Sequence, residues 1–375
     1  MVYNKYFLLV IFCSSIIGII LSFLNNSLVD QKYTNDNNNI KEHSKKENKE
    51  KKTKEEEQDK DKKNNQNIEN KLINDHNENI NKKKKLRIAT AYATDNTYIY
   101  PTIVAMTSLV DTAGNNTFYK IYVMHTPDFT TKSKNFLKTV ENKYPDKCIV
   151  VFFDMGNKYT GLKLNFRISE PTYYRLSLQD ILPYEKRIIW MDGDTLVFED
   201  LTELFQLDMK GNVVMGFLDS EPDAISSFGF KNATVICGGV LLLDLESLRK
   251  YDYSEKIEEF IKNNKEKLSQ QDQTIINVVM QDRIGILPPK YGIWAWGEKD
   301  KQSAINHNNK QRPWLKYNET ELLYAVEHPG ILHFIWPKPF WRNNTSFDTE
   351  WWDYARKTGF YDDIYKKSPI PSIKW

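Results

Sequence analysis

The chain has 375 residues and a formal net charge of +2, and 27% of its residues are charged. This balance gives no reason to expect nucleic-acid binding, because proteins of that class concentrate basic side chains. The cysteines, Cys13, Cys148 and Cys237, lie too far apart in the sequence to predict a zinc site or a disulfide framework. A single bridge between Cys148 and Cys237 is not favoured.

An uncharged apolar segment, residues 7–24, follows Lys5 near the N-terminus. At about 1.5 Å per residue it is just long enough to span a bilayer of about 30 Å. The alternative is a cleaved signal peptide, but the run is long for one, and no small-residue cleavage site follows it. We therefore expect residues 1–5 to be a cytoplasmic tail and residues 6–24 a signal-anchor transmembrane helix.

Residues 25–85 are dominated by Lys, Asn, Glu and Asp. Such a segment cannot bury enough apolar surface to fold, so we expect a disordered, low-complexity stem. Residues 86–375 are numerous enough to bury a large core. The whole pattern predicts a single-pass type II protein of the Golgi or ER membrane with a luminal globular domain. Candidate N-glycosylation sequons at Asn115, Asn232, Asn318 and Asn344 agree with a luminal domain.

From residue 86 onward, apolar runs typical of strands alternate with segments of helical spacing. We expect strands at residues 86–91, 119–124, 148–153, 187–191, 213–217, 235–243 and 331–334. We expect helices at residues 100–111, 133–143, 173–181, 245–264 and 272–280. The alternation predicts βαβ units and a parallel sheet, in which ligands bind at the carboxyl ends of the strands.

The strongest local signal is Asp192-Gly193-Asp194, directly after the apolar strand at residues 187–191. Two carboxylates this close repel each other and are costly to desolvate unless a cation lies between them. A hard divalent metal binds such oxygens and can bridge the phosphates of a substrate. Gly193 is expected to let the backbone turn sharply. The alternative is a loop turn with two solvated aspartates.

Other polar side chains also lie at predicted strand or helix ends. His333 could give the same metal a nitrogen ligand, and Lys338, in a proline-stiffened loop, could meet a diphosphate. Asp272 opens a helix and could be an ordinary N-cap. Asp95 and Tyr98 follow the first strand, where they could bind and stack on a base or simply form a turn.

In this order, these segments resemble glycosyltransferase family 8. The resemblance covers residues 86–340 and rests on the loop after the first strand, Tyr173-Tyr174-Arg175-Leu176, the Asp-Gly-Asp motif, a glycine-containing strand, Gln271-Asp272-Gln273 and the late His-Phe segment. It implies a retaining enzyme whose residues 86–375 form one GT-A, Rossmann-like α/β domain with a mixed, mostly parallel sheet.

The resemblance also implies a role for each matched residue. Donor contacts would come from Ala93, Asp95, Thr97 and Tyr98 to the uridine of a UDP-sugar, from Asp192 to the ribose and from Lys338 to the diphosphate. The ligands of a Mn²⁺ ion would be Asp192, Asp194 and His333. At the reacting sugar, Arg175 and Asp272 would hold hydroxyls, Gln273 would lie beneath the anomeric carbon, and Asp219 would face the sugar or acceptor.

The sequence departs from the family pattern at three positions. Cys237 stands where the family usually has Asn, Trp336 stands where it has Gly, and Lys338 comes one residue early. The expected function is transfer of a hexose, glucose or galactose, from UDP to a hydroxyl of a glycan, glycoprotein or glycolipid. The departures keep open an alternative, a catalytically inactive sugar- or nucleotide-binding protein on the same fold. A self-glucosylating cytosolic enzyme is disfavoured by the N-terminal apolar segment.

Overall fold

Strands and helices alternate from Leu86 onward, as the apolar periodicity predicts. The computed structural model describes residues 85–164, 169–219, 221, 223–295, 301–311, 313–335, 338–340 and 346–368, all within the unit Ile80–Trp375. The expected tail, membrane anchor and stem, up to residue 84, lie outside these residues. Among the described helices, none combines the length and hydrophobicity that a bilayer crossing requires.

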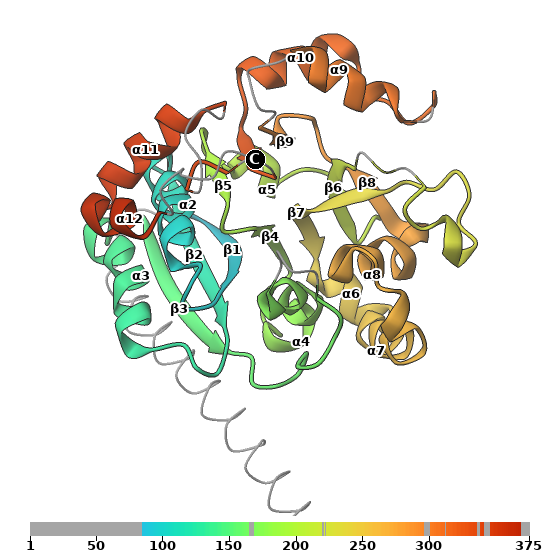
Figure 1. Cartoon of the computed structure of the whole chain (residues 1–375), viewed down its shortest axis with the longest axis horizontal. Coiled ribbons are helices and arrows are strands. Elements are labelled where there is room, and N and C mark those ends of the chain that lie inside the picture. Colours follow the sequence, from blue (N-terminus) through green and yellow to red (C-terminus); the bar gives the residue numbers. More distant parts are fainter. Residues whose placement is uncertain are drawn as a thin grey trace, which may run out of the picture. The chain divides into compact units, whose positions relative to one another are not determined.

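Two sheets form the centre of the domain (Figure 1). The larger one has, in spatial order, β3 (Cys148–Asp154), β2 (Thr117–His125), β1 (Leu86–Thr94), β4 (Arg187–Met191), β7 (Ile236–Asp244), β6 (Val214–Leu218) and β8 (Ile284–Ile286). Its β3-β2-β1-β4 part is parallel, β7 is antiparallel to both of its neighbours, and β8 is parallel to β6. The smaller sheet contains β5 (Thr195–Val197), β10 (Ile331–His333) and β9 (Tyr291–Trp294). The mixed, mostly parallel α/β fold is therefore confirmed.

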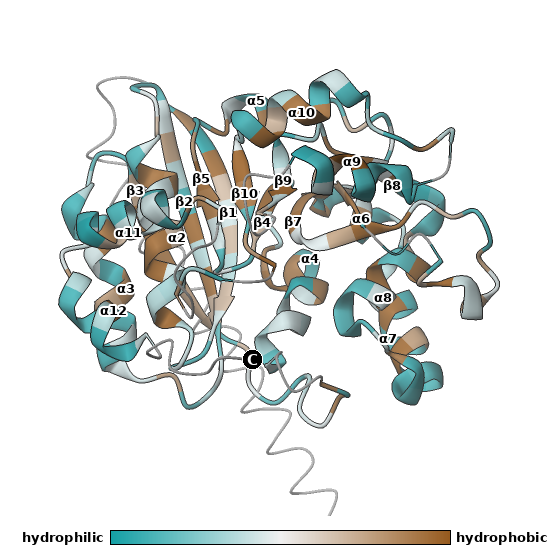
Figure 2. Cartoon of the chain, turned by 45° about the horizontal axis from the view of Figure 1, so that its top comes forward, coloured by the Kyte–Doolittle hydropathy of each residue, from teal (hydrophilic) through white to brown (hydrophobic). Residues whose placement is uncertain are grey.

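Helices cover these sheets. Those described are α2 (Ile99–Asp111), α3 (Thr131–Lys143), α4 (Leu178–Ile181), α5 (Thr202–Phe205), α6 (Leu245–Lys250), α7 (Tyr253–Asn264), α8 (Gln271–Val279), α9 (Lys301–Asn309), α10 (Glu319–Glu327), α11 (Asp348–Lys357) and α12 (Tyr361–Lys367). Figure 1 shows α11 beside α2, and α6, α7 and α8 near β7. In Figure 2 the strands are mostly hydrophobic, whereas the outer faces of α7, α11 and α12 are hydrophilic. This is the pattern of a buried sheet with amphipathic cover.

Two predicted helices differ from the structure. The segment predicted as one helix at 245–264 is divided into α6 and α7, because Asp252 takes a left-handed conformation with φ of 54°. The segment at 173–181 is mostly the 3₁₀ helix Glu170–Ser177, which has Pro171 in its first turn and runs into α4. A 3₁₀ helix shares the apolar spacing of a short α-helix closely enough that the sequence pattern does not separate them.

The strand directions bring distant segments to one edge of the large sheet. Because β1 and β4 are parallel, Asp95 and Asp192 both follow strand ends at that edge. Because β7 runs antiparallel to β4, its first residues lie there too, and the Asp192 amide donates to the Gly239 carbonyl at 2.8 Å. β6 is antiparallel to β7, so Asp219, just after its end, comes to the same edge.

Candidate active site

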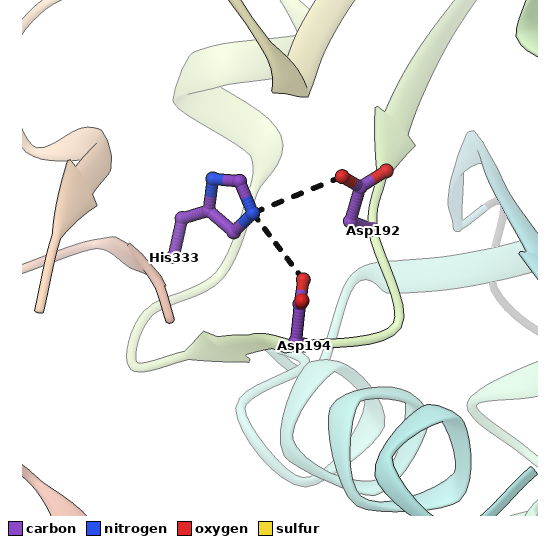
Figure 3. A group of neighbouring side chains, drawn as sticks. All are labelled: Asp192, Asp194 and His333. Atoms are coloured by element: carbon purple, nitrogen blue, oxygen red, sulfur yellow. Dashed lines mark ion pairs between the residues drawn. The ribbon is translucent and has the colours of Figure 1, made fainter. Parts of the chain in front are cut away.

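Asp192, Asp194 and His333 form a cluster at this edge. Asp194 leads directly into β5, and β5 pairs with β10, so that Thr195 lies opposite His333. One ligand atom from each of the three residues lies within 4.8 Å of the others. The His333 Nε2 atom is 3.2 Å from Asp194 Oδ1 and 3.7 Å from Asp192 Oδ2 (Figure 3). The smaller sheet thus brings together side chains that are about 140 residues apart in the sequence.

Two glycines make room for this cluster. A Cβ atom on Gly239 would lie 2.0 Å from His333 Cε1, so only glycine leaves room for the imidazole ring to pack against β7 at this point. A Cβ atom on Gly193 would lie 2.6 Å from Thr102 Oγ1 and 3.1 Å from the Tyr98 ring. Gly193 is not among the described glycines with positive φ. The predicted turn is present, since the Thr195 amide donates to the Asp192 carbonyl at 3.2 Å, but it does not depend on a positive φ. The close approach of Thr102 and Tyr98 is a further reason for a residue without a side chain here.

Asp194 is buried, with only 6% of its surface exposed. Its Oδ2 atom accepts a hydrogen bond from Tyr98 Oη at 2.8 Å and pairs with Lys338 Nζ, which also donates to Tyr98 Oη at 3.1 Å. Its Oδ1 atom, which faces His333, accepts no hydrogen bond from the described residues. A buried carboxylate oxygen without a hydrogen bond is costly, so positive charge belongs beside it: that of the protonated His333 ring, 3.2 Å away, or that of a cation that displaces the ring proton.

The pKa values of Asp194 and His333 agree with a requirement for positive charge beside Asp194. Burial alone would raise the pKa of Asp194, but Lys338 and His333 hold it well below its usual range. Burial would lower the pKa of His333, but the Asp194 carboxylate raises it to about 10. Burial, followed by the charge of Asp194, raises the pKa of Tyr98 well above its ordinary value. Asp194 is therefore ionised near neutral pH and surrounded by groups that hold protons.

Hydrogen bonds to the Asp95 side chain fix the conformation of the loop after β1. Asp95 Oδ1 accepts from the Thr97 amide at 2.8 Å, from Thr97 Oγ1 at 2.6 Å and from the Tyr98 amide at 3.0 Å. This is the turn that was the alternative interpretation of the segment. Ala93 is half-buried near the end of β1, and the turn brings the Tyr98 hydroxyl to Asp194. A uridine contact by these four residues stays a prediction.

Arg175 is buried on the other side of Asp192 and contacts several residues of the site. Its Nη2 atom is 2.7 Å from Asp192 Oδ1, and its Nε atom is 3.0 Å from Asp272 Oδ2. Its Nη1 atom donates to the Gly238 carbonyl, and its guanidinium lies 4.5 Å from the centre of the Trp190 ring. Trp190 Nε1 also donates to Asp192 Oδ1 at 2.9 Å. Arg175 therefore links two of the predicted site carboxylates and orients one of the metal ligands.

Asp272 does not cap its helix, since Gln270 holds the N-cap position of α8. The Asp272 side chain points into the domain, where Oδ1 accepts from Thr172 Oγ1 at 2.6 Å. Burial raises its pKa to about 6 despite the opposing charge of Arg175. The simple N-cap interpretation is therefore wrong. Asp272 belongs to the buried polar network of the site.

Gln273 lies on the same helix with both of its amide atoms engaged. Its Oε1 atom accepts from the Gly238 amide at 2.8 Å, and its Nε2 atom donates to Asp219 Oδ2 at 2.9 Å. Because a backbone N–H requires an acceptor and a carboxylate requires a donor, these partners fix which way the amide points. Four residues further along α8, Asn277 pairs with both backbone polar groups of Ile236 at 2.8 Å. The helix thereby holds the edge of β7 and positions Gln273.

The structure also reveals partners that sequence reasoning missed. The Leu218 amide donates to Tyr317 Oη at 3.0 Å, His307 Nε2 bonds the Leu218 carbonyl at 2.9 Å, and Gln311 donates to the Asp219 carbonyl. Burial raises the pKa of Asp219. The segment that supplies these side chains has no motif in the sequence, and its helix α9 is only weakly amphipathic. Only the three-dimensional structure places it against Asp219.

The residues of the cluster fit a divalent metal ion. Two carboxylates and one imidazole offer hard oxygen and nitrogen donors, as Mn²⁺ and related ions prefer. The buried Asp194 Oδ1 atom, which accepts no hydrogen bond from any residue that the structure describes, is the atom that such an ion would contact. When bound there, a metal ion would supply positive charge that can neutralise phosphate oxygens.

The α/β domain thus carries a cluster of two carboxylates and one histidine at the strand ends. The family model for glycosyl transferase family 8 matches residues 89–345. The chain therefore belongs to this family of glycosyltransferases.

The chain is also similar to individual proteins of known sequence or structure. General stress protein A of Bacillus subtilis is 28% identical over 211 residues, which are 54% of this chain and 70% of that protein. The galactosyltransferase LgtC, solved with donor and acceptor sugar analogues, has a TM-score of 0.58 at 19% identity and covers 76% of this chain and 98% of its own. The bifunctional glycosyltransferase WbbM has a TM-score of 0.60 at 18% identity, over 75% of this chain and 52% of its own. At these identities the two structures establish likeness of fold alone.

Proposed function

We propose that the chain is a retaining, Mn²⁺-dependent hexosyltransferase that moves glucose or galactose from UDP to a hydroxyl of a glycan, glycoprotein or glycolipid. The observation that carries the proposal is the Asp192–Asp194–His333 cluster, in which the buried Asp194 Oδ1 atom faces His333 and accepts no hydrogen bond from the described residues. Family membership supports the reaction class. The likeness of fold to a galactosyltransferase solved with sugar analogues supports a nucleotide-sugar donor and a sugar acceptor.

The chain's own residues would divide the work around this cluster. Lys338, beside Asp194, is placed to meet the phosphates of the donor, and Tyr98 holds both side chains in position. Arg175 and Asp272, which pair at 3.0 Å, would orient the hydroxyls of the sugar. Charge that builds on the leaving diphosphate would be stabilised by Lys338 and by the cation that the cluster holds.

Retention of configuration requires either a covalent intermediate or attack from the face of the leaving group. Gln273 is a poor nucleophile, because its neutral amide oxygen would have to become charged, and that oxygen already accepts from the Gly238 amide. Asp219 accepts from Gln273 and from the Glu221 amide, at 2.9 and 2.8 Å. We therefore favour same-face attack, with a departing phosphate oxygen as the base.

A donor screen tests the proposal. The full-length chain in detergent, with Mn²⁺, is given a panel of UDP-hexoses, and UDP release is measured with and without saccharide acceptors. The expected result is release from UDP-glucose or UDP-galactose well above that from the other donors. UDP binding without release on any donor or acceptor would instead favour the alternative, a catalytically inactive binding protein.

We also propose that residues 6–24 anchor the protein in the Golgi or ER membrane with the domain in the lumen. The uncharged run and the polar stem after it support this. Carbonate extraction of membranes, followed by protease treatment of sealed vesicles, tests the topology. A protein that is released by carbonate, or cut from the cytoplasmic side, would contradict it.

A further inference from the structure

Cys237 lies directly behind the proposed metal ligand His333. Its Sγ atom is 3.8 Å from His333 Nδ1, within hydrogen-bonding distance for sulfur. Both side chains are buried, each with 6% of its residue surface exposed. Among the described residues, Sγ is the atom recorded as a partner of Nδ1, while Nε2 faces the two carboxylates. The imidazole therefore lies between a thiol and the acidic cluster.

The geometry of β7 explains this arrangement. Successive residues of a strand point to opposite faces, so Cys237 and Gly239 lie on one face and Gly238 on the other. On the first face, the absence of a Cβ atom at Gly239 makes room for the His333 ring. On the second face, a Cβ atom at Gly238 would lie 2.9 Å from Arg175 Nη1. The Cys-Gly-Gly stretch thus separates the His333 side of the site from the Arg175–Asp272 side.

The chemistry of the imidazole then assigns a role to the thiol. A neutral histidine carries one ring proton, and a metal can bind only the nitrogen without it. For Nε2 to serve as the ligand, Nδ1 must carry the proton and needs an acceptor behind it. Ligand histidines in proteins usually meet a carboxylate or carbonyl there, and loss of that partner typically weakens metal binding about 10–100-fold.

We propose that Cys237 is a positioning residue for the metal site: its sulfur accepts the Nδ1 proton of His333 and fixes the tautomer in which Nε2 faces Asp192 and Asp194. The thiol would not itself bind the metal or touch the donor. This inference rests on the proposed metal-dependent function, and it adds a residue that family membership does not assign.

Metal binding and the tautomer of His333 test the inference together. Mn²⁺ affinity is measured by electron paramagnetic resonance on the full-length chain and on the variants Cys237→Val and Cys237→Ser. Valine has a similar size but no acceptor, so we expect its Mn²⁺ affinity to fall about 10-fold or more. Serine keeps an acceptor, and we expect it to stay within about 3-fold of the native affinity. Cys148→Val, at a buried thiol in β3, is the matched control and should bind as the native chain does.

The tautomer provides a readout that a purely structural role would not change. With Zn²⁺ as a diamagnetic probe, ¹⁵N spectra of His333 should show a single Nδ1–H form in the native chain and in Cys237→Ser. A mixture of forms is expected in Cys237→Val. If Cys237→Val binds Mn²⁺ with native affinity and keeps the single Nδ1–H form, the inference is wrong. If the native chain binds Mn²⁺ no better than Asp194→Ala does, the proposed metal-dependent function fails instead.

Discussion

Arg175 and Asp272 form a buried ion pair, with Nε 3.0 Å from Oδ2 and side chains that are only 4% and 6% exposed. Arg175 also holds Asp192, so a single cation serves two carboxylates in the interior. Removing one partner of such a pair leaves uncompensated buried charge, which is more damaging than losing the pair as a whole.

Arg175→Met should therefore lower the free energy of unfolding by about 3–5 kcal/mol. The double variant Arg175→Met/Asp272→Leu should regain part of that loss, because the orphaned carboxylate is gone. Urea denaturation of the unit at residues 80–375 measures both. A single variant as stable as the native protein would show that the pair contributes nothing to the fold.

The pKa of Asp272, raised to about 6, predicts a pH dependence of stability. A carboxyl whose folded pKa is raised stabilises the fold fully below its unfolded pKa of 3.8, and that contribution is lost as pH rises through about 6. The shift corresponds to about 3 kcal/mol at most. The stability of the native chain relative to Asp272→Asn should accordingly fall between pH 4 and pH 7. A difference that is flat or rises over this range would contradict the assignment.

Gly239→Ala should abolish metal binding through a steric effect, because its Cβ atom would meet His333 Cε1 at 2.0 Å. The cost in stability should be large in the native background. It should nearly vanish in His333→Ala, since the clashing ring is then absent. Thermal unfolding of the four chains of this double-mutant cycle isolates the contact. Equal costs in both backgrounds would show that the alanine disturbs something other than His333.

Gln273→Glu should reduce turnover, because a carboxylate would replace the amide that donates to Asp219. Two carboxylates at hydrogen-bonding distance repel each other, and one must take up a proton. Adding Asp219→Asn restores a donor–acceptor pair of reversed direction, so the double variant should recover stability relative to Gln273→Glu.

Intact-mass measurement of the native chain during turnover should show no glycosyl adduct. An adduct on Gln273 or Asp219 would refute same-face attack.

The periodicity of apolar residues predicted much of the fold, and it missed strands that are too short to show a pattern. The long apolar strands and α2 were predicted within a few residues. The strands β5, β8 and β9 have only three or four residues, too few to show an alternating pattern. Yet β5 and β10 decide the site, because their pairing brings His333 to Asp194.

Some features of the site were likewise predicted from the sequence, whereas others became visible only in the structure. The metal cluster was predicted because carboxylates at a strand end need a cation, and the structure brings its three members together. The link of Tyr98 to Asp194 and the contact of Cys237 with His333 depend on side-chain directions that no spacing in the sequence encodes. Cys237 is one of the positions at which the sequence departs from the family pattern. Its position behind His333 connects it to the metal site.

The most direct test of the central claim is UDP release from the preferred donor as a function of Mn²⁺ concentration, in the native chain and in Asp194→Ala. Asp194 supplies the buried oxygen that accepts no hydrogen bond within the described part of the chain, and Asp194→Ala removes it. We expect saturable, Mn²⁺-dependent release in the native chain, abolished by chelation, and at least a 100-fold loss in the variant, on the order of removing a major electrostatic contribution to catalysis. Release that is independent of metal, or unchanged in Asp194→Ala, would contradict the account.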